Sequence, residues 1–231
     1  MAKKRLIVFT GAGISAESGI KTFRDSGGLW EEFRIEDVAT IDAWIKNREL
    51  VLEFYNQRRK QVMAAKPNGA HDLIAELQTK FDVQVVTQNV DDLHERAGSK
   101  NVIHLHGEIM KARSTADPDL IYQLNKAELV VGDNCIKGSQ LRPHIVWFGE
   151  DVPQMDMANE LAAQADLFAV VGTSLNVYPA AGIIHFVKTN TPKWLVDPGD
   201  FNLDHVKGLQ HIKQTAVNGV RTLKEELFKN L

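Results

Sequence analysis

Two histidines that lie two residues apart could supply an acid–base catalyst. They belong to the segment HLHGE, which begins at residue 104 and follows two apolar residues. Alternation along a strand would place His104 and His106 on the same face. An imidazole that titrates near neutrality is suited to deprotonate a hydroxyl group. We therefore expect a general base in this segment, with a structural role for His104.

A second group of polar side chains follows another short apolar run. Residues 87–94 read TQNVDDLH and come directly after the apolar residues 83–86. Their amides and carboxylates could hydrogen-bond a ribose or a carboxamide. Asn89 or Asp91 could equally well cap the N-terminus of a helix. Both interpretations place these residues at the carboxyl end of a strand.

A glycine-rich turn follows the first apolar run of the chain. Residues 11–16, GAGISA, fit the pattern G-x-G-x-x-A directly after LIVF at 6–9, which is the setting of a dinucleotide-binding turn. Backbone N–H groups at a helix start can bind pyrophosphate oxygens, whereas a purely conformational role for the glycines is the alternative. The acidic residue expected after a second strand is not evident. The turn thus predicts nucleotide binding, but not an ordinary dehydrogenase.

Tyr55 and Arg58 could together bind a carboxylate. They are three residues apart in a helical pattern, so their side chains lie on one helical face. The guanidinium would give paired hydrogen bonds and the phenol a third. A solvated basic helix face is the alternative, because Arg59 and Lys60 follow. We favour the carboxylate site.

The elements that must position these residues alternate between strands and helices. Short apolar runs at 6–9, 83–86, 167–171 and 194–196 end in small or polar residues and are typical of strands buried on both faces. Helical patterns lie at 68–79, 157–165 and 220–231. This order predicts an α/β fold, a Rossmann-like parallel sheet with helices on both faces. Ligands would bind beyond the carboxyl ends of the strands.

Two regions of the chain do not follow this alternation. Residues 22–67 are charged and mostly helical in pattern, and residues 107–142 mix short apolar runs with turn signals. We expect these insertions to form a small lobe within one catalytic domain, 1–231. The large Rossmann-like lobe would comprise residues 1–21, 68–106 and 143–231.

The composition excludes several classes of protein. The chain has 231 residues and a formal net charge of −3, which gives no electrostatic footprint for nucleic acid. No run approaches the roughly 18 apolar residues of a membrane span, and the start lacks the longer apolar core of a signal peptide. The single cysteine, Cys135, cannot form an internal disulfide. We expect a cytoplasmic protein with no nucleic-acid or membrane partner.

Five motifs in order resemble those of the sirtuins across nearly the whole chain: GAGISAESGI, TFR, TQNVDDLH, HLHGE and GTS. The resemblance implies an NAD-dependent protein lysine deacylase that consumes NAD, releases nicotinamide and transfers the acyl group to ADP-ribose. Its partners would be acylated lysine side chains of proteins or peptides. An NAD hydrolase or ADP-ribosyltransferase using the same site is the alternative. A non-catalytic NAD-binding module is a third hypothesis, against which the intact Asn89, Asp91 and His106 argue.

The resemblance also implies roles for individual residues. His106 matches the catalytic histidine, which deprotonates a ribose hydroxyl of NAD, and Asn89 and Asp91 match residues that hold the nicotinamide end. A mobile loop at 22–25 would cover the reacting ribose. Asp197 stands where the family usually has asparagine, and its charge could weaken NAD binding. The residues expected to contact NAD are Gly11, Ala12, Gly13, Ser15, Ile20, Phe23, Arg24, Gln88, Gly172, Thr173, Ser174, Asp197 and Ala216.

Substrate recognition is implied for two further stretches. Residues 142–150, RPHIVWFGE, resemble the family segment to which the substrate backbone adds as a strand. Tyr55 and Arg58 match the Tyr-x-x-Arg of the sirtuins that remove succinyl, malonyl or glutaryl groups. This match implies desuccinylase and demalonylase activity together with deacetylase activity. Beside that pair, the expected substrate contacts are Val146, Phe148, Gly149 and Tyr178, while Ile145 and Trp147 on the opposite face would belong to the core.

The small lobe departs from the family pattern. Most sirtuins hold zinc there with two Cys-x-x-Cys-like pairs, whereas this chain has Ser114 near the first position and only Cys135 near the second pair. One thiolate with the nearby aspartates makes a poor tetrahedral zinc site. We predict no structural zinc. The lobe would then be held by the packing of Leu120, Ile121, Leu124, Leu129 and Val130.

Overall fold

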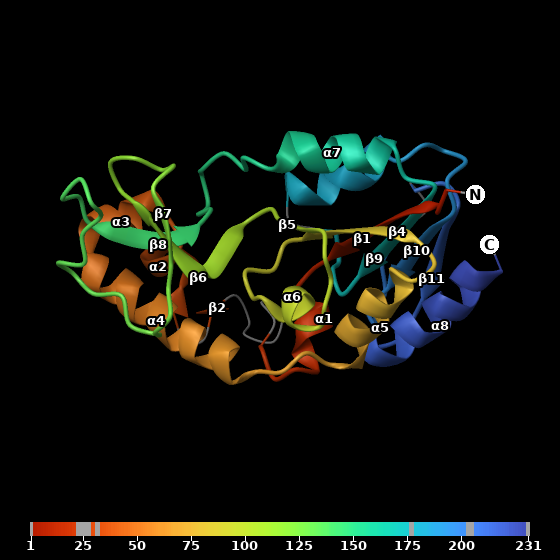
Figure 1. The fold of residues 1–231 in the computed structure, drawn as a ribbon, viewed down its shortest axis with the longest axis horizontal. Helices are drawn as coiled ribbons and strands as arrows, with labels where there is room; N and C mark the ends of the chain where they lie inside the picture. Colours follow the sequence, from red (N-terminus) through yellow and green to blue (C-terminus); the bar gives the residue numbers. More distant parts are fainter. Residues whose placement is uncertain (1, 22–28, 31–32, 176–177, 202–205, 230–231) are drawn as a thin grey trace.

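A six-stranded sheet in the order β11-β10-β9-β1-β4-β5 forms the centre of the large lobe (Figure 1). The computed structural model describes residues 2–21, 29–30, 33–175, 178–201 and 206–229. All neighbouring strands in this sheet run parallel, so their carboxyl ends share one edge. The strands are β1 Arg5–Thr10, β4 Asp82–Thr87, β5 Val102–His104, β9 Leu167–Val171, β10 Lys193–Val196 and β11 Leu209–Ile212.

Helices cover both faces of this sheet, as the alternation of patterns predicted. In β1, Leu6 and Val8 pack on the face under α5 (Gly69–Leu77) and α8 (Ala216–Phe228). Ile7 and Phe9 pack on the other face, under α7 (Met155–Ala163) and the 3-10 helix η2 (Ala180–Phe186). In Figure 1, α7 lies above the sheet and α5 and α8 lie below it. All four side chains are fully buried, which explains why the strand reads as a continuous apolar run. The Rossmann-like α/β fold class is confirmed.

The chain reverses its direction across the sheet between β1 and β9. From β1 it proceeds to β4 and β5 on one side, and then returns to β9, β10 and β11 on the other. Ligands of open α/β sheets bind at such a reversal, beyond the carboxyl ends of the strands. The glycine turn after β1, which opens α1 (Gly13–Ala16), and the segment GTS after β9 both lie there.

The predicted helices are present, and the last one starts earlier than its apolar stripe. Helix α8 begins at Ala216 rather than near residue 220. Its N-terminal backbone is satisfied from another element, because the Val217 N–H donates to the carboxylate of Glu17, which follows α1. A long-range cap of this kind leaves no local pattern in the sequence.

A separate small antiparallel sheet has the strand order β7-β6-β8. It packs with α4 around a shared apolar cluster, to the left in Figure 1. Strand β8 pairs with β6 through residue 145, across the predicted boundary at 142/143. The division into lobes stays a prediction. The elements are β2 Leu29–Trp30, β3 Phe33–Arg34, α2 Ile35–Val38, α3 Ile41–Lys46, α4 Arg48–Ala64, β6 Gly107–Ser114, β7 Ile121–Gln123 and β8 Leu141–Ile145, while α6 Leu93–Arg96 follows β4.

The predicted packing of the small lobe is wrong for two side chains. Leu124 and Leu129 are buried and Leu120 packs against the same cluster. Ile121 is 47% exposed and Val130 is 50% exposed. Ile121 begins β7, an edge strand of the small sheet, and Val130 lies in a turn that closes through its N–H bond to the Asp133 carboxylate. Within the described residues, no helix is long and apolar enough to cross a membrane.

Candidate active site

The turns after β1 and β9 pack against each other through their backbones. The Gly13 N–H donates to the Gly172 carbonyl at 2.8 Å, and the Gly11 N–H donates to the Val171 carbonyl at 3.0 Å. A Cβ at Gly13 would lie 2.7 Å from the Gly172 Cα, and one at Gly172, whose φ is +69°, would lie 2.3 Å from the Ile14 nitrogen. No side chain fits this contact. The conformational role of the glycines is therefore real.

The backbone donors of this turn already have partners. Beside Gly11 and Gly13, the N–H groups of Ile14 and Ser15 donate to the carbonyls of Gly11 and Ala12, both at 3.1 Å. A pyrophosphate at these donors would compete with those bonds. The predicted NAD contacts of the turn stay predictions.

Asn89, Ser15 and Asp91 form one buried network that ties the end of β4 to the glycine turn. The Asn89 Nδ2 donates to the Gly11 carbonyl and to the Ser15 hydroxyl oxygen, both at 3.2 Å. The Ser15 hydroxyl donates to Asp91 Oδ2 at 3.0 Å. Asp91 Oδ1 also accepts the Leu93 N–H, but the N-cap residue of α6 is Asp92, so the capping alternative is wrong for Asn89 and Asp91. Burial raises the pKa of Asp91, and these two hydrogen bonds partly offset the rise.

The geometry of His106 assigns its tautomer. Its Nδ1 lies 3.0 Å from the carbonyl oxygen of Gln88. A carbonyl only accepts, so Nδ1 carries the proton and Nε2 keeps a lone pair when the ring is neutral. Burial lowers the pKa of His106, and the bond to Gln88 only partly opposes it. The ring is thus neutral at physiological pH, as a general base must be.

His104 holds the next carbonyl along the same loop. Its Nδ1 lies 2.8 Å from the carbonyl oxygen of Asn89, and its Nε2 lies 2.8 Å from a carboxylate oxygen of Glu95. Both partners are acceptors, so the doubly protonated imidazolium satisfies both bonds at once. Burial opposes the charged form, but the hydrogen bond and charge of Glu95 outweigh it and raise the pKa of His104. The two histidines therefore contact the carbonyls of consecutive residues, and their pKa values are shifted in opposite directions.

The remaining predicted NAD contacts lie along the same edge of the sheet. The Gln88 Nε2 donates to the Thr173 hydroxyl at 3.2 Å, which links the ends of β4 and β9, and Ser174 is half-buried beside it. Asp197, after β10, is 2% exposed and accepts the Gly199 N–H. Ile20 and Ala216 are buried. Phe23 and Arg24 lie outside the described residues.

The segment 142–150 shows the two faces that the sequence indicated. Ile145 and Trp147 are buried, whereas Val146 is half-buried and Phe148 is 54% exposed. The N–H of Val146 donates to the His106 carbonyl at 3.0 Å, so this segment is anchored beside the candidate base. Gly149 is exposed, and so is Tyr178, on a separate loop.

The basic-face interpretation of α4 is wrong. Arg58 is 6% exposed and Arg59 is fully buried, whereas Lys60 alone of this run points to solvent. Arg59 donates to the carbonyls of Ile109 and Ala127, far along the chain. Tyr55 is 1% exposed, on the same face of α4 as Arg58.

The sequence profile of the Sir2 family matches residues 11–179. This chain belongs to the Sir2 family. A relative from Bacteroides thetaiotaomicron, named NAD-dependent protein deacylase, is 48% identical over 230 residues, which cover 97% of this chain and 98% of the relative. One of the same name from Aggregatibacter actinomycetemcomitans is 52% identical over 192 residues, 83% of this chain and 92% of the relative.

Solved Sir2 structures share the whole fold. A Sir2 homologue in complex with NAD has a TM-score of 0.85 and 39% identity, and covers 97% of this chain and 91% of that chain. A mutant Sir2 homologue in complex with ADP-ribose has a TM-score of 0.87 at 38% identity, covering 98% and 94% of the two chains. The fold and the family expected from the motifs are thus confirmed.

The small lobe of this Sir2 chain does not fit a structural zinc. Cys135 is buried and unpaired with any other cysteine, and it lies against Ser114 rather than against a second thiol. Across the described ranges of the chain, no group of three or more His, Cys, Asp or Glu side chains could hold a metal. Metal content stays a prediction to be measured.

Two contributors to this Sir2 site were not foreseen from the sequence. Glu95 reaches His104 from α6, and Trp147 donates from its indole to the hydroxyl of Tyr55 at 3.0 Å, a partner 92 positions away. Neither contact follows from local spacing. The signal available was chemical: a glutamate in TQNVDDLHER next to the motif, and a tryptophan inside RPHIVWFGE.

Proposed function

We propose that this protein removes succinyl and malonyl groups, as well as acetyl groups, from lysine side chains of proteins. Family membership and the similarity to NAD-dependent protein deacylases make it an NAD-dependent enzyme of that class. The acyl preference and the roles of single residues are the content of the proposal.

We expect the dinucleotide beyond the carboxyl ends of β1, β4 and β9, where the order of the strands reverses. A Cβ at Gly11 would lie 2.6 Å from the Thr173 Cβ and 3.2 Å from the Gln88 Nε2, so a glycine is needed where these three strand ends meet. Gln88, Thr173 and Asp197 would hold the riboses, and the Asn89–Asp91 network would hold the nicotinamide end. Bound NAD supplies the ADP-ribose that receives the acyl group.

The protein's part in proton transfer falls to His106. Its Nδ1–H is fixed on the Gln88 carbonyl at 3.0 Å, which leaves the Nε2 lone pair to take a proton from a hydroxyl group. The lowered pKa keeps that lone pair available at neutral pH. Asn89 and Asp91, joined through Ser15, keep the neighbouring loop in place.

The acyl preference rests on one observation, the burial of Tyr55 and Arg58 on one face of α4. The two residues are three positions apart in α4, so their side chains leave the helix on the same face. A carboxylate placed between them would receive charge-assisted hydrogen bonds in low-dielectric surroundings, where such bonds are strong. An acetyl group offers no carboxylate and gains nothing from this pair.

The test compares peptides that differ only in one lysine. The protein is incubated with NAD and acetyl-, succinyl- or unmodified-lysine peptide, and products are followed by mass spectrometry. We expect O-acyl-ADP-ribose with both acyl peptides and faster turnover of the succinyl peptide. Equal nicotinamide release without any acyl peptide would support the NAD-hydrolase alternative instead.

A further inference from the structure

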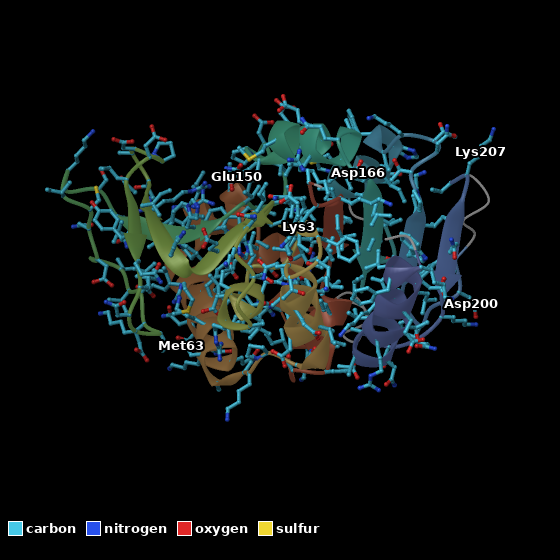
Figure 2. The ribbon with its side chains drawn as sticks, turned by 45° about the vertical axis from the view of Figure 1, so that its right-hand side comes forward. Lys3, Met63, Glu150, Asp166, Asp200 and Lys207 are labelled. Atoms are coloured by element: carbon cyan, nitrogen blue, oxygen red, sulfur yellow. The ribbon has the colours of Figure 1, made fainter. Side chains whose placement is uncertain are left out.

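Within the segment 142–150, the side chains of Arg142 and Glu150 hold Trp147 in place. Both carboxylate oxygens of Glu150, labelled beside the small sheet in Figure 2, accept from the Arg142 guanidinium at 2.7 and 2.9 Å. The same carboxylate accepts the Trp147 N–H at 2.8 Å. The Arg142 guanidinium in turn lies 3.3 Å from the centre of the Trp147 ring. Glu150 therefore holds the backbone N–H of Trp147, and Arg142 covers one face of its ring.

The Trp147 ring is enclosed on its other sides as well. The ring of Trp44 lies 5.7 Å away and that of Tyr55 lies 6.4 Å away, between centroids. Trp147 is 2% exposed. Close packing of this kind favours one orientation of the ring, and in this orientation the indole N–H points to the Tyr55 oxygen.

The indole N–H of Trp147 restricts the direction in which the Tyr55 hydroxyl can donate its own proton. The indole Nε1 donates to the Tyr55 oxygen at 3.0 Å, and an indole N–H has no acceptor function. The phenol must therefore direct its own proton away from Trp147. Among the described residues, Trp147 is the hydrogen-bond partner that the Tyr55 oxygen has.

We propose that Trp147 is a positioning residue for acyl specificity, which orients the Tyr55 hydroxyl as a hydrogen-bond donor toward the carboxylate of an acidic acyl group. This inference rests on the proposed function of the Tyr55–Arg58 pair. Burial raises the pKa of Tyr55, so the phenol retains the proton that it donates. Without the indole N–H, the phenol proton would have no preferred direction and its alignment with the carboxylate would be lost.

A double-mutant cycle tests this link. The variants are Trp147→Phe, Tyr55→Phe and the two combined, and the readout is the ratio of kcat/KM for succinyl-lysine over acetyl-lysine in one peptide sequence. Trp147→Phe is expected to lower this ratio about 5–10-fold, the value of one neutral hydrogen bond, through the KM for the succinyl peptide. In the Tyr55→Phe background the same substitution should leave the ratio unchanged.

The control is Trp194→Phe, a buried tryptophan of β10 that packs in a different apolar cluster from Trp147. It should lower stability but keep the wild-type ratio. If Trp194→Phe lowers the ratio as much as Trp147→Phe, a general loss of packing explains the effect and the inference fails. It also fails if Trp147→Phe lowers the ratio further in the Tyr55→Phe background.

A shape-preserving replacement keeps the test decisive if Trp147→Phe does not fold. Site-specific β-(3-benzothienyl)alanine at position 147 retains the bicyclic ring and exchanges the N–H for sulfur, and we expect the same loss in ratio. A wild-type ratio with this residue overturns the role of Trp147. If Tyr55→Phe lowers the ratio in that experiment, the proposed carboxylate site survives; if Tyr55→Phe and Arg58→Met both leave it unchanged, the proposed acyl preference itself fails.

Discussion

His104 and His106 contact two consecutive carbonyl oxygens through the same ring nitrogen, yet their surroundings move their pKa values in opposite directions. His106 meets only burial and the Gln88 carbonyl, so its pKa falls. His104 meets Glu95 and, at longer range, Glu108, so its pKa rises. The proposed mechanism requires neutral His106 and charged His104, which would hold Asn89. The pH profile of kcat/KM should therefore decline on the acid side with His106 and on the basic side with His104.

Replacing Glu95 separates these two limbs. Glu95→Gln keeps a hydrogen-bond acceptor for His104 but removes the charge that favours its protonated form. We expect the basic limb of the kcat/KM profile to move to lower pH while the acid limb stays in place. Glu76→Gln, on α5 and paired with Lys224, is the matched control and should leave both limbs unchanged. A profile that only drops in height would indicate that Glu95 acts through stability alone.

Arg58→Met tests the charged residue of the proposed carboxylate site. The substitution keeps an unbranched side chain of similar length but removes the guanidinium, so the acidic acyl group loses charge-assisted hydrogen bonds worth about 2 kcal/mol. We expect kcat/KM for the succinyl peptide to fall roughly 30-fold, with little change for the acetyl peptide. Lys60→Met, at an exposed position of the same helix, should change neither. An equal fall for both peptides would show that Arg58 does not distinguish them.

At the scale of elements, α5 and α6 enclose two fully buried histidines behind the glycine turn. The rings of His71 and His94 lie 5.0 Å apart, and His94 also contacts the Thr10 hydroxyl at 3.0 Å. Burial lowers the pKa of His71 to about 4 and that of His94 well below its usual value. Both are neutral in the folded protein, whereas the unfolded chain binds protons below about pH 6.5. Stability should therefore fall as the pH drops below 6.5.

The measurement is urea unfolding at pH 7.5 and pH 5 for the wild type and His71→Asn. A folded pKa near 4 against about 6.5 unfolded means that His71 alone removes about 2 kcal/mol of stability over this interval. Between the two pH values, the free energy of unfolding of the variant should fall by about 2 kcal/mol less than that of the wild type. This holds even if the variant is less stable at both pH values. His185→Asn, at an exposed position, should show the wild-type pH dependence.

Local patterns predicted β1, β9 and β10 because these strands are buried on both faces and so read as apolar runs, as in residues 6–9, but they did not predict β11, which is only partly buried. They did not predict the start of α8, which depends on Glu17, or the burial of Arg59, which depends on carbonyls some 50 and 68 positions away. The same limit applies to the site. The spacing of His104 and His106 indicated one shared face, but the opposite shifts of their pKa values come from Glu95 and burial, which only the folded chain assembles.

At the scale of the whole molecule, we predict that hydrogen bonds, rather than zinc, hold the region around the small sheet together. In the loop at 130–141, the Gln140 amide accepts the Gly132 N–H at 2.8 Å and donates to the carbonyls of Val130 and Asp133 at 3.1 Å. Asn56 of α4 holds the start of this loop by donating to the Leu129 carbonyl and accepting its N–H. These amides cross-link the loop to itself and to α4.

This arrangement predicts that chelation leaves the protein intact, whereas loss of Gln140 does not. We expect no stoichiometric zinc by elemental analysis and an unchanged Tm after prolonged EDTA treatment, because the residues that the structure describes include no group of three or more His, Cys, Asp or Glu side chains that could hold a metal. Gln140→Ala should instead lower stability by about 1–3 kcal/mol, since several backbone groups lose a partner together, and should increase hydrogen exchange over residues 130–141. Gln123→Ala, an exposed amide in the same lobe with one bond to the Met110 carbonyl, serves as the control. A Tm that falls on chelation and recovers with zinc would show that metal holds this lobe after all.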